Sequence, residues 1–238
     1  MKAEPFFIGR VPAVLYGEKS EDLFLFVHGL GGSHEEGARF AEVACPLGYR
    51  VLAVDLPQHG GRRDGRPLVP WVAVPELQEV FRYAAERYAR LSVRAISIGA
   101  WLSLVAFSGC RVEKCLFSSP LLDMERMILS MMQAAGVSEQ RLSAEREIPV
   151  PGGQTLSWEY LCWVREHPAS ALCPNTALLR ATGDEMIPRD TVTDFAVRNA
   201  ARLTEYPGGQ HWLHTPEEMT AMAAWEREEL TRAGTASL

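Results

Sequence analysis

Short apolar segments alternate with helical segments along almost the whole chain, and this alternation restricts the possible folds more than any other feature. Continuous apolar runs of four to six residues are typical of strands buried on both faces of a sheet. Strands that alternate with helices predict parallel crossover connections, and therefore an α/β fold with a doubly wound, mostly parallel sheet. We predict strands at 23–27, 50–54, 93–96, 114–118, 176–181 and 201–206.

The helical segments lie between these strands. In 75–90, apolar residues recur at spacings of three and four, and Pro75 stands in the expected first turn. The last helix carries Glu217 and Glu218 in its first turn, where acidic side chains stabilise the helix dipole. Residues 6–16 are expected to form an antiparallel edge hairpin. We predict helices at 35–45, 75–90, 100–107 and 216–231.

One long segment, 121–170, interrupts the alternation because it contains no run typical of a strand. It combines a Met-rich helical stretch with a cluster of aromatic residues. We therefore predict a core made of 1–120 and 171–238, with 121–170 inserted as a helical cap over the carboxyl ends of the strands. The alternative is a set of ordinary helices whose Met and Trp side chains fill the core.

Composition excludes several classes of protein. The 238 residues include 24 basic and 30 acidic side chains, so a net charge of −6 gives no electrostatic reason to bind nucleic acid or an anionic membrane. The five cysteines are scattered without C-x-x-C spacing, which argues against a disulfide framework or a thiolate zinc site. We see no signal-peptide pattern and no apolar run approaching about 18 residues. We expect reduced thiols and a cytoplasmic location.

Ser97 lies where a predicted strand meets a predicted helix, within Ala95-Ile96-Ser97-Ile98-Gly99. A serine in such a sharp turn is exposed at the rim of the sheet. The turn brings the backbones two residues before and after the serine together, so small residues are needed there, and Ala95 and Gly99 meet this need. The same serine is also compatible with a simple helix N-cap.

A glycine-rich loop, H-G-L-G-G-S at 28–33, follows the first apolar strand. Glycines permit close approach of the backbone, so such a loop can direct an N–H group at a developing oxyanion. The candidate donors are the amides of Leu30 and Ile98. A phosphate-binding turn is the alternative, but the loop lacks the lysine of a P-loop and has only the first part of a dinucleotide fingerprint.

A carboxylate and a histidine follow the last two predicted strands. Asp184 stands in G-D-E-M-I-P, with Glu185 and Asp190 as substitutes. His211 stands in G-G-Q-H-W, with His214 as its rival. The chain order is thus serine, acid, histidine, with each residue at the end of a strand, as in the α/β-hydrolase arrangement.

On these motifs, together with D-L-P-Q-H-G at 55–60, the chain resembles the α/β-hydrolase superfamily over nearly its whole length. The resemblance implies a serine hydrolase with Ser97, Asp184 and His211 as the catalytic triad, and 121–170 as the variable cap. In that family the loop that 55–60 resembles shapes the floor of the pocket, so His59 is not expected to be catalytic. Gln58 departs from the family's glycine in this loop.

The expected reaction is hydrolysis of a small to medium carboxylic ester or thioester through an acyl-enzyme. It requires no metal or organic cofactor, and the histidines have no metal-ligand spacing. The expected partner is a small-molecule acyl substrate; the oligomeric state is not predicted. Alternatives on the same fold are a peptidase or amidase, an acyltransferase, and a non-catalytic ligand-binding protein.

An apolar acyl pocket is expected because Met, Leu, Trp and Tyr are frequent in the cap. Asp123 is interpreted as an anchor of the cap, with an alternative role as the triad acid. The predicted substrate-contacting residues are Met127, Met131, Trp158, Trp163 and Trp212.

Overall fold

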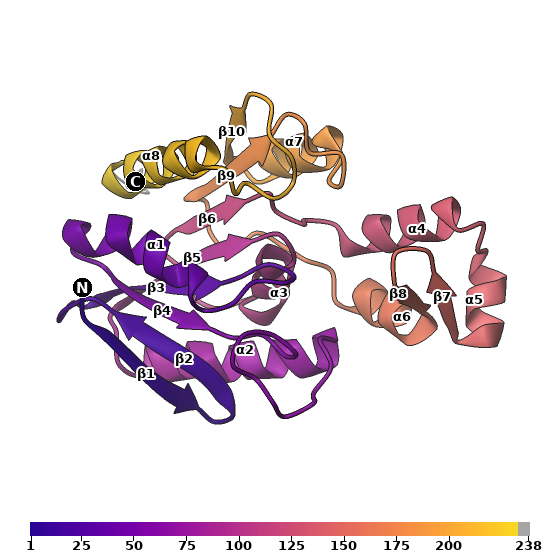
Figure 1. Ribbon diagram of the computed structural model, residues 1–238, viewed down its shortest axis with the longest axis horizontal. Coiled ribbons are helices and arrows are strands. Elements are labelled where there is room, and N and C mark those ends of the chain that lie inside the picture. Colours follow the sequence, from indigo (N-terminus) through magenta and orange to yellow (C-terminus); the bar gives the residue numbers. More distant parts are fainter. Residues whose placement is uncertain (233–238) are drawn as a thin grey trace. The chain divides into compact units, whose positions relative to one another are not determined.

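A computed structural model describes residues 1–232, and this part of the chain divides into two compact units. The first unit consists of Met1–Leu122 and of the chain from Ser170 onward. The second unit is the intervening segment, Asp123–Ala169. Figure 1 shows the elements of both units along the chain.

An eight-stranded sheet lies at the centre of the first unit (Figure 1). The strand order is β1-β2-β4-β3-β5-β6-β9-β10. The edge hairpin β1–β2 is antiparallel, β2 is antiparallel to β4, and all other neighbours are parallel. This arrangement confirms the predicted fold class. The strands are β1 (Ala3–Ile8), β2 (Val11–Tyr16), β3 (Asp22–Val27), β4 (Arg50–Val54), β5 (Arg90–Ile96), β6 (Cys115–Ser118), β9 (Thr176–Ala181) and β10 (Arg202–Tyr206).

Helices cover the sheet of this unit, with α1 packed against α8 and α2 packed against α3. The predicted start of the second helix was wrong: α2 begins at Pro70, and Pro75 lies inside it. Either proline fits a first turn, but burial of Val72 and Val74 extends the helix to Pro70. The helices are α1 (Glu36–Ala44), the 3-10 helix η1 (Cys45–Leu47), α2 (Pro70–Ala85), α3 (Ile98–Ala106), α7 (Arg189–Arg198) and α8 (Pro216–Thr231).

Side chains that alternate along β3 build one layer of the core. Phe24 and Phe26 lie in a buried cluster with Phe40 of α1 and Trp225 of α8. The rings of Phe24 and Phe40 meet edge to face, with centroids 5.1 Å apart. Burial of these aromatic rings holds α1 and α8 on the same face of the sheet.

A buried ion pair adds a polar link to this layer. Arg94, in the middle of β5, is fully buried, and its Nε donates to Oε1 of Glu226 in α8 at 2.8 Å. The same guanidinium donates through Nη1 to the carbonyl of Ala95 at 2.8 Å. The helix that follows the His211 loop is therefore tied to the strand that precedes Ser97.

The second unit contains three helices and a hairpin: α4 (Met124–Ala134), α5 (Glu139–Glu145), β7 (Glu147–Val150), β8 (Gln154–Ser157) and α6 (Trp158–Glu166). The hairpin corrects the expectation that 121–170 lacks strands. Each of its strands buries one side chain, Ile148 or Leu156, so no apolar run marks them in the sequence. Arg165 of α6 forms ion pairs with Glu125 and Glu139, which connects the three helices.

Two general features concern the whole described part of the chain. All five cysteines are free thiols. Among residues 1–232, each helix is too short or too polar to cross a membrane.

Candidate active site

Three loops at the carboxyl ends of β5, β9 and β10 bring Ser97, Asp184 and His211 together. The Ser97 hydroxyl lies 2.8 Å from Nε2 of His211. Nδ1 of His211 lies 2.8 Å from Oδ2 of Asp184. A carboxylate only accepts hydrogen bonds, so Nδ1 carries the imidazole proton and Nε2 is free to accept from the hydroxyl. The three side chains form one continuous hydrogen-bonded chain.

Ser97 occupies a strained turn between β5 and α3. Its φ of 50° and ψ of −120° are rare for a residue with a side chain. Gly99 makes this turn possible, because a Cβ there would lie 2.4 Å from the carbonyl oxygen of His28 and 2.6 Å from that of Val27. The strained turn and the close packing of the next helix turn hold the hydroxyl at the rim of the sheet.

Asp184 is buried, with only 3% of its surface exposed. Burial alone would raise the pKa of its carboxyl group. Hydrogen bonds from His211 and from the backbone amide of Ile187 outweigh this effect and lower the pKa below its usual value. Oδ1 accepts from the amides of Met186 and Ile187 at 2.9 and 3.0 Å, while Oδ2 faces His211. Asp184 is therefore an ionised acceptor for the imidazole at neutral pH.

The loops that carry Asp184 and His211 are joined by their backbones. The amide of Gly183 donates to the carbonyl of Gly208 at 3.1 Å, and the amide of Gly208 donates to the hydroxyl oxygen of Thr182 at 2.8 Å. A Cβ at Gly183 would lie 2.2 Å from the carbonyl oxygen of Gly209. These contacts fix the distance between the acid and the histidine.

Arg180 and Thr182 are two supporting residues that sequence reasoning did not find. Arg180 is buried in β9 and donates through Nη2 to the carbonyl of Asp184 at 2.9 Å. Thr182 holds the His211 loop, as described above. Their place at the end of the strand that precedes Asp184 is the only signal in the sequence that could have indicated them.

His214, the rival histidine, has other partners. Its Nδ1 lies 2.8 Å from the carbonyl oxygen of Trp212, and its ring stacks on the indole with centroids 4.3 Å apart. Its amide donates to Glu218, the residue that completes the capping box of α8. Of the two histidines on this loop, His211 is the one that meets Ser97.

The glycine-rich loop passes close to Ser97. A Cβ on Gly29 would lie 3.4 Å from Cβ of Ser97. The backbone just before Leu30 therefore runs beside the serine. Ile98, the other predicted donor, is the first residue of α3. The orientation of this loop depends on His28, a fully buried residue whose Nδ1 donates to the carbonyl of Gly29 at 2.7 Å. That the two amides form an oxyanion hole stays a prediction.

Comparison with solved structures shows the same architecture in several hydrolases. A protein from Agrobacterium vitis S4 with a provisional hydrolase assignment has a TM-score of 0.76 at 14% identity, covering 96% of this chain and 98% of that one. Alpha/beta hydrolase domain-containing protein 10 from mouse gives 0.74 at 13% identity, covering 96% and 98%. The chain has the α/β-hydrolase fold.

Est1E from Butyrivibrio proteoclasticus, solved with ferulic acid bound, shares this fold with a TM-score of 0.70 at 18% identity, covering 97% of this chain and all of that one. Neither a protein-family model nor a curated protein matches the sequence. In the α/β-hydrolase fold the nucleophile, the acid and the histidine follow successive strand ends in the chain order found here.

The other predicted acids have separate contacts within this α/β-hydrolase fold. Glu185 is exposed. Asp190 accepts from the amide of Thr191 at the start of α7. Asp123 is the N-cap of α4 and accepts from the amide of Arg126 at 2.9 Å. Its predicted role as an anchor of the cap stays a prediction.

The predicted substrate-contacting residues fall into both units. Trp212 lies next to His211 and is 70% exposed. The others lie on α4 and α6 of the second unit and are half-buried: Met127, Met131, Trp158 and Trp163. Their contact with substrate stays a prediction. The described residues contain no group of three or more His, Cys, Asp or Glu side chains arranged to hold a metal ion.

Proposed function

We propose that this protein is a serine hydrolase that cleaves small to medium carboxylic esters or thioesters. The observation that supports the proposal most strongly is the chain of 2.8 Å hydrogen bonds from Ser97 through His211 to Asp184. The names of structural neighbours agree with it: Est1E, a marine microorganism esterase, and a thioesterase domain from the curacin biosynthetic pathway.

In the proposed reaction, His211 takes the hydroxyl proton as Ser97 attacks the acyl carbon. Asp184 holds the imidazole in the required tautomer and stabilises its positive charge. The amides of Leu30 and Ile98 bind the negative oxygen of the tetrahedral intermediate, and one such donor is typically worth about 3 kcal/mol. His211 then protonates the leaving alcohol or thiol. A water molecule, activated in the same way, releases the acid from Ser97.

The substrate is proposed to be an acyl compound with an apolar acyl group. Trp212 beside His211 offers an exposed aromatic surface in the first unit. A cytoplasmic location is proposed because free thiols persist in a reducing compartment.

The test is hydrolysis of p-nitrophenyl esters of graded chain length. Ser97→Ala is expected to abolish turnover, and Asp184→Asn and His211→Ala to lower kcat by about 10³- to 10⁴-fold each, with less than additive losses when combined. His214→Ala is the matched control, because it removes a histidine from the same loop. Turnover that survives in Ser97→Ala, or a loss in His214→Ala as large as that expected for His211→Ala, contradicts the assignment.

A further inference from the structure

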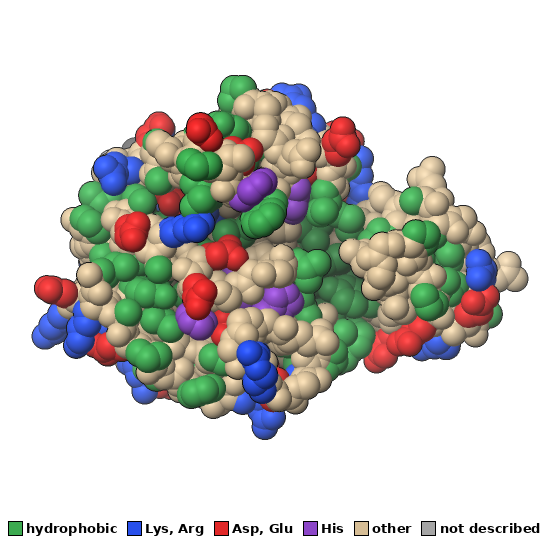
Figure 2. All heavy atoms as spheres, viewed as in Figure 1, with side chains coloured by type: hydrophobic (Ala, Val, Ile, Leu, Met, Phe, Trp, Pro, Cys, Tyr) green, Lys and Arg blue, Asp and Glu red, His purple; other side chains and the backbone are tan. Residues whose placement is uncertain are grey.

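We propose that His59 is a positioning residue that holds the glycine-rich loop 28–33 in the shape needed for oxyanion binding. The inference rests on the proposed function, because that function assigns the Leu30 amide as an oxyanion donor. His59 acts through the backbone of Gly31, whose amide donates to Nε2 of His59 at 2.9 Å. Figure 2 shows that histidine side chains gather on this face of the first unit.

The two peptide units on either side of Leu30 are each held by a histidine ring. In the first, the Gly29 carbonyl accepts from Nδ1 of His28 at 2.7 Å. In the second, the Gly31 amide donates to His59. A peptide unit is planar and trans, so fixing one end of it also fixes the direction of the other end. The bond from His28 therefore sets the direction of the Leu30 N–H, and the bond to His59 fixes the peptide that follows, so Leu30 cannot rotate between them without breaking one of the two bonds.

The contacts of His59 define its protonation state. Its Nδ1 lies 2.7 Å from the carbonyl oxygen of Pro57, which can only accept, so Nδ1 carries the proton. Nε2 of the neutral ring therefore has a lone pair for the Gly31 amide. A neutral imidazole with this tautomer satisfies both contacts, and a side chain without an acceptor at this place cannot.

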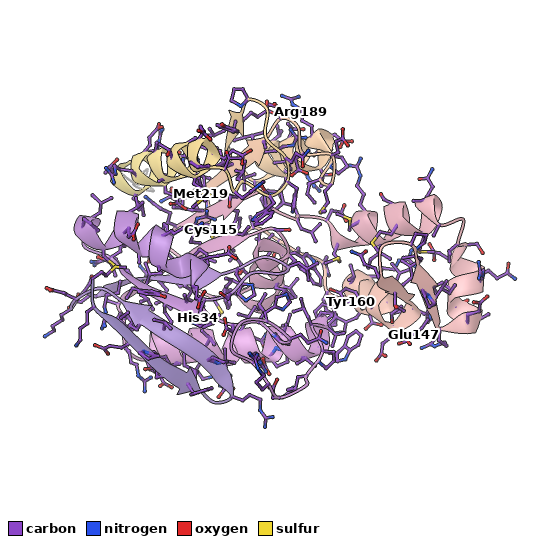
Figure 3. The ribbon with its side chains drawn as sticks, viewed as in Figure 1. His34, Cys115, Glu147, Tyr160, Arg189 and Met219 are labelled. Carbon is purple, nitrogen blue, oxygen red and sulfur yellow. The ribbon has the colours of Figure 1, made fainter. Side chains whose placement is uncertain are left out.

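The loop that carries His59 is firmly attached to the rest of the first unit. Asp55, at its start, is buried and accepts from the amide and the ring of His34 and from the amide of Gly61. Arg62, at its end, is also buried and forms an ion pair with Glu76 of α2. His59 thus projects from a loop that is anchored on both sides. Figure 3 labels His34, the partner of Asp55, which directly follows the glycine-rich loop.

Near Leu30 the glycine-rich loop has one turn bond, from the amide of Gly32 to the carbonyl of Gly29 at 3.2 Å, but little side-chain packing. Gly31 has a φ of 79°, and nothing lies within 4 Å of the place where its Cβ would be. The Leu30 side chain is 67% exposed, so packing does not hold it. Glycine backbones have many accessible conformations. The bond to His59 therefore restricts the Leu30–Gly31 peptide at a point where side-chain packing is missing.

The experiment compares His59→Leu, which lacks the acceptor, with His59→Gln, whose side-chain oxygen can reach the place of Nε2. For p-nitrophenyl acetate, we expect His59→Leu to lower kcat by about 10- to 100-fold with KM within about twofold, because misplaced donors weaken transition-state binding. The inhibition constant of a boronic acid, which mimics the tetrahedral intermediate, should rise by the same factor. His59→Gln should recover most of both losses.

The matched control is Arg63→Leu, since Arg63 is exposed on the same loop and its side chain donates to the carbonyls of Gly60 and Arg62. This control is expected to keep wild-type kcat. Hydrogen exchange gives a readout that does not depend on catalysis: the Gly31 amide should exchange at least about tenfold faster in His59→Leu than in the wild type. Unchanged exchange, or unchanged kcat and boronic acid inhibition, overturns the proposal.

Two further results keep this inference separate from the proposed function. If the wild type neither hydrolyses esters nor reacts with a fluorophosphonate, the proposed function fails. The role of His59 in oxyanion binding then fails with it. Hydrogen exchange at the Gly31 amide still reports whether the bond to His59 restricts the loop. If His59→Leu does not fold, His59→Asn replaces it, because its side chain is too short to reach Gly31. Equal kcat for His59→Asn and His59→Gln then overturns the proposal, and a slower His59→Asn supports it.

Discussion

His28 shows how one buried side chain connects the site to the pH dependence of stability. Its ring accepts from the Leu56 amide at Nε2 and donates to Gly29 from Nδ1, so it is neutral. Burial lowers the pKa of this imidazole to about 4. In the unfolded chain the same group binds a proton near its usual pKa of about 6.5. The contribution of His28 to stability is therefore complete above about pH 6.5 and is lost as the pH falls towards 4.

The measurement is the free energy of urea unfolding of the wild type and of His28→Asn between pH 7 and pH 4. His28→Asn has no group that titrates at this position. We expect the stability of the wild type to fall relative to that of the variant, with a slope approaching about 1.4 kcal/mol per pH unit. A constant difference across this range would mean that His28 titrates alike in both states.

Two glycines near Ser97 differ in how much room they have. A Cβ at Gly99 would lie 2.4 Å from a backbone oxygen, whereas a Cβ at Gly29 would meet its nearest atom at 3.4 Å, an ordinary contact. We expect Gly99→Ala to destabilise the fold by about 2 to 3 kcal/mol through overpacking, and Gly29→Ala by less than about 1 kcal/mol. Thermal unfolding of both variants measures this difference. Equal losses would show that the turn at Ser97 can relax.

The sequence could indicate the candidate site residues because each follows a strand. It predicted His211 as the triad histidine and left His214 as a rival. The two lie three residues apart on one loop, and their directions depend on the backbone. Gly208 and Gly209 have φ values of 74° and 63°, which turn the loop so that His211 faces Ser97. The two glycines show that such a turn is possible, but residue types alone do not give the direction of the turn.

Among the contacts between elements, the buried ion pair that joins β5 to α8 is sensitive to single substitutions. Arg94 and Glu226 have almost no contact with solvent. Glu226→Leu would leave the Arg94 charge buried without its partner, and we expect a loss of about 3 to 5 kcal/mol. The double variant Arg94→Met with Glu226→Leu should recover much of this loss. Urea unfolding of the single and double variants measures the coupling, and strictly additive losses would contradict it.

Elements with long apolar runs or regular helical spacing could be predicted, and those with little burial could not. β4 and β9 have the predicted bounds, and α8 begins and ends at the predicted residues. The hairpin β7–β8 escaped prediction because each strand buries only one side chain. α7 was not predicted, since it has few apolar positions and lies directly after the loop of Asp184.

For the molecule as a whole, the parallel sheet explains why residues far apart in the sequence meet. Parallel strands end at one edge of a sheet, and open α/β sheets bind ligands there. Ser97, Asp184 and His211 come to this edge from three strands that together span about half the chain. The parallel sheet and its helical connections could be expected from the alternation of strands and helices. The order of the strands could not, and neither could the hairpin β7–β8, because each of its strands buries only one side chain.

In the proposed function, His211 and Asp184 make the hydroxyl of Ser97 reactive. The most direct test is reaction of the intact protein with a fluorophosphonate, followed by mass spectrometry of the peptide that contains Ser97. We expect one adduct, located on Ser97, that is absent in Ser97→Ala and forms orders of magnitude more slowly in His211→Ala. A wild-type protein that stays unlabelled at Ser97, or labels as fast without the His211 imidazole, would contradict it.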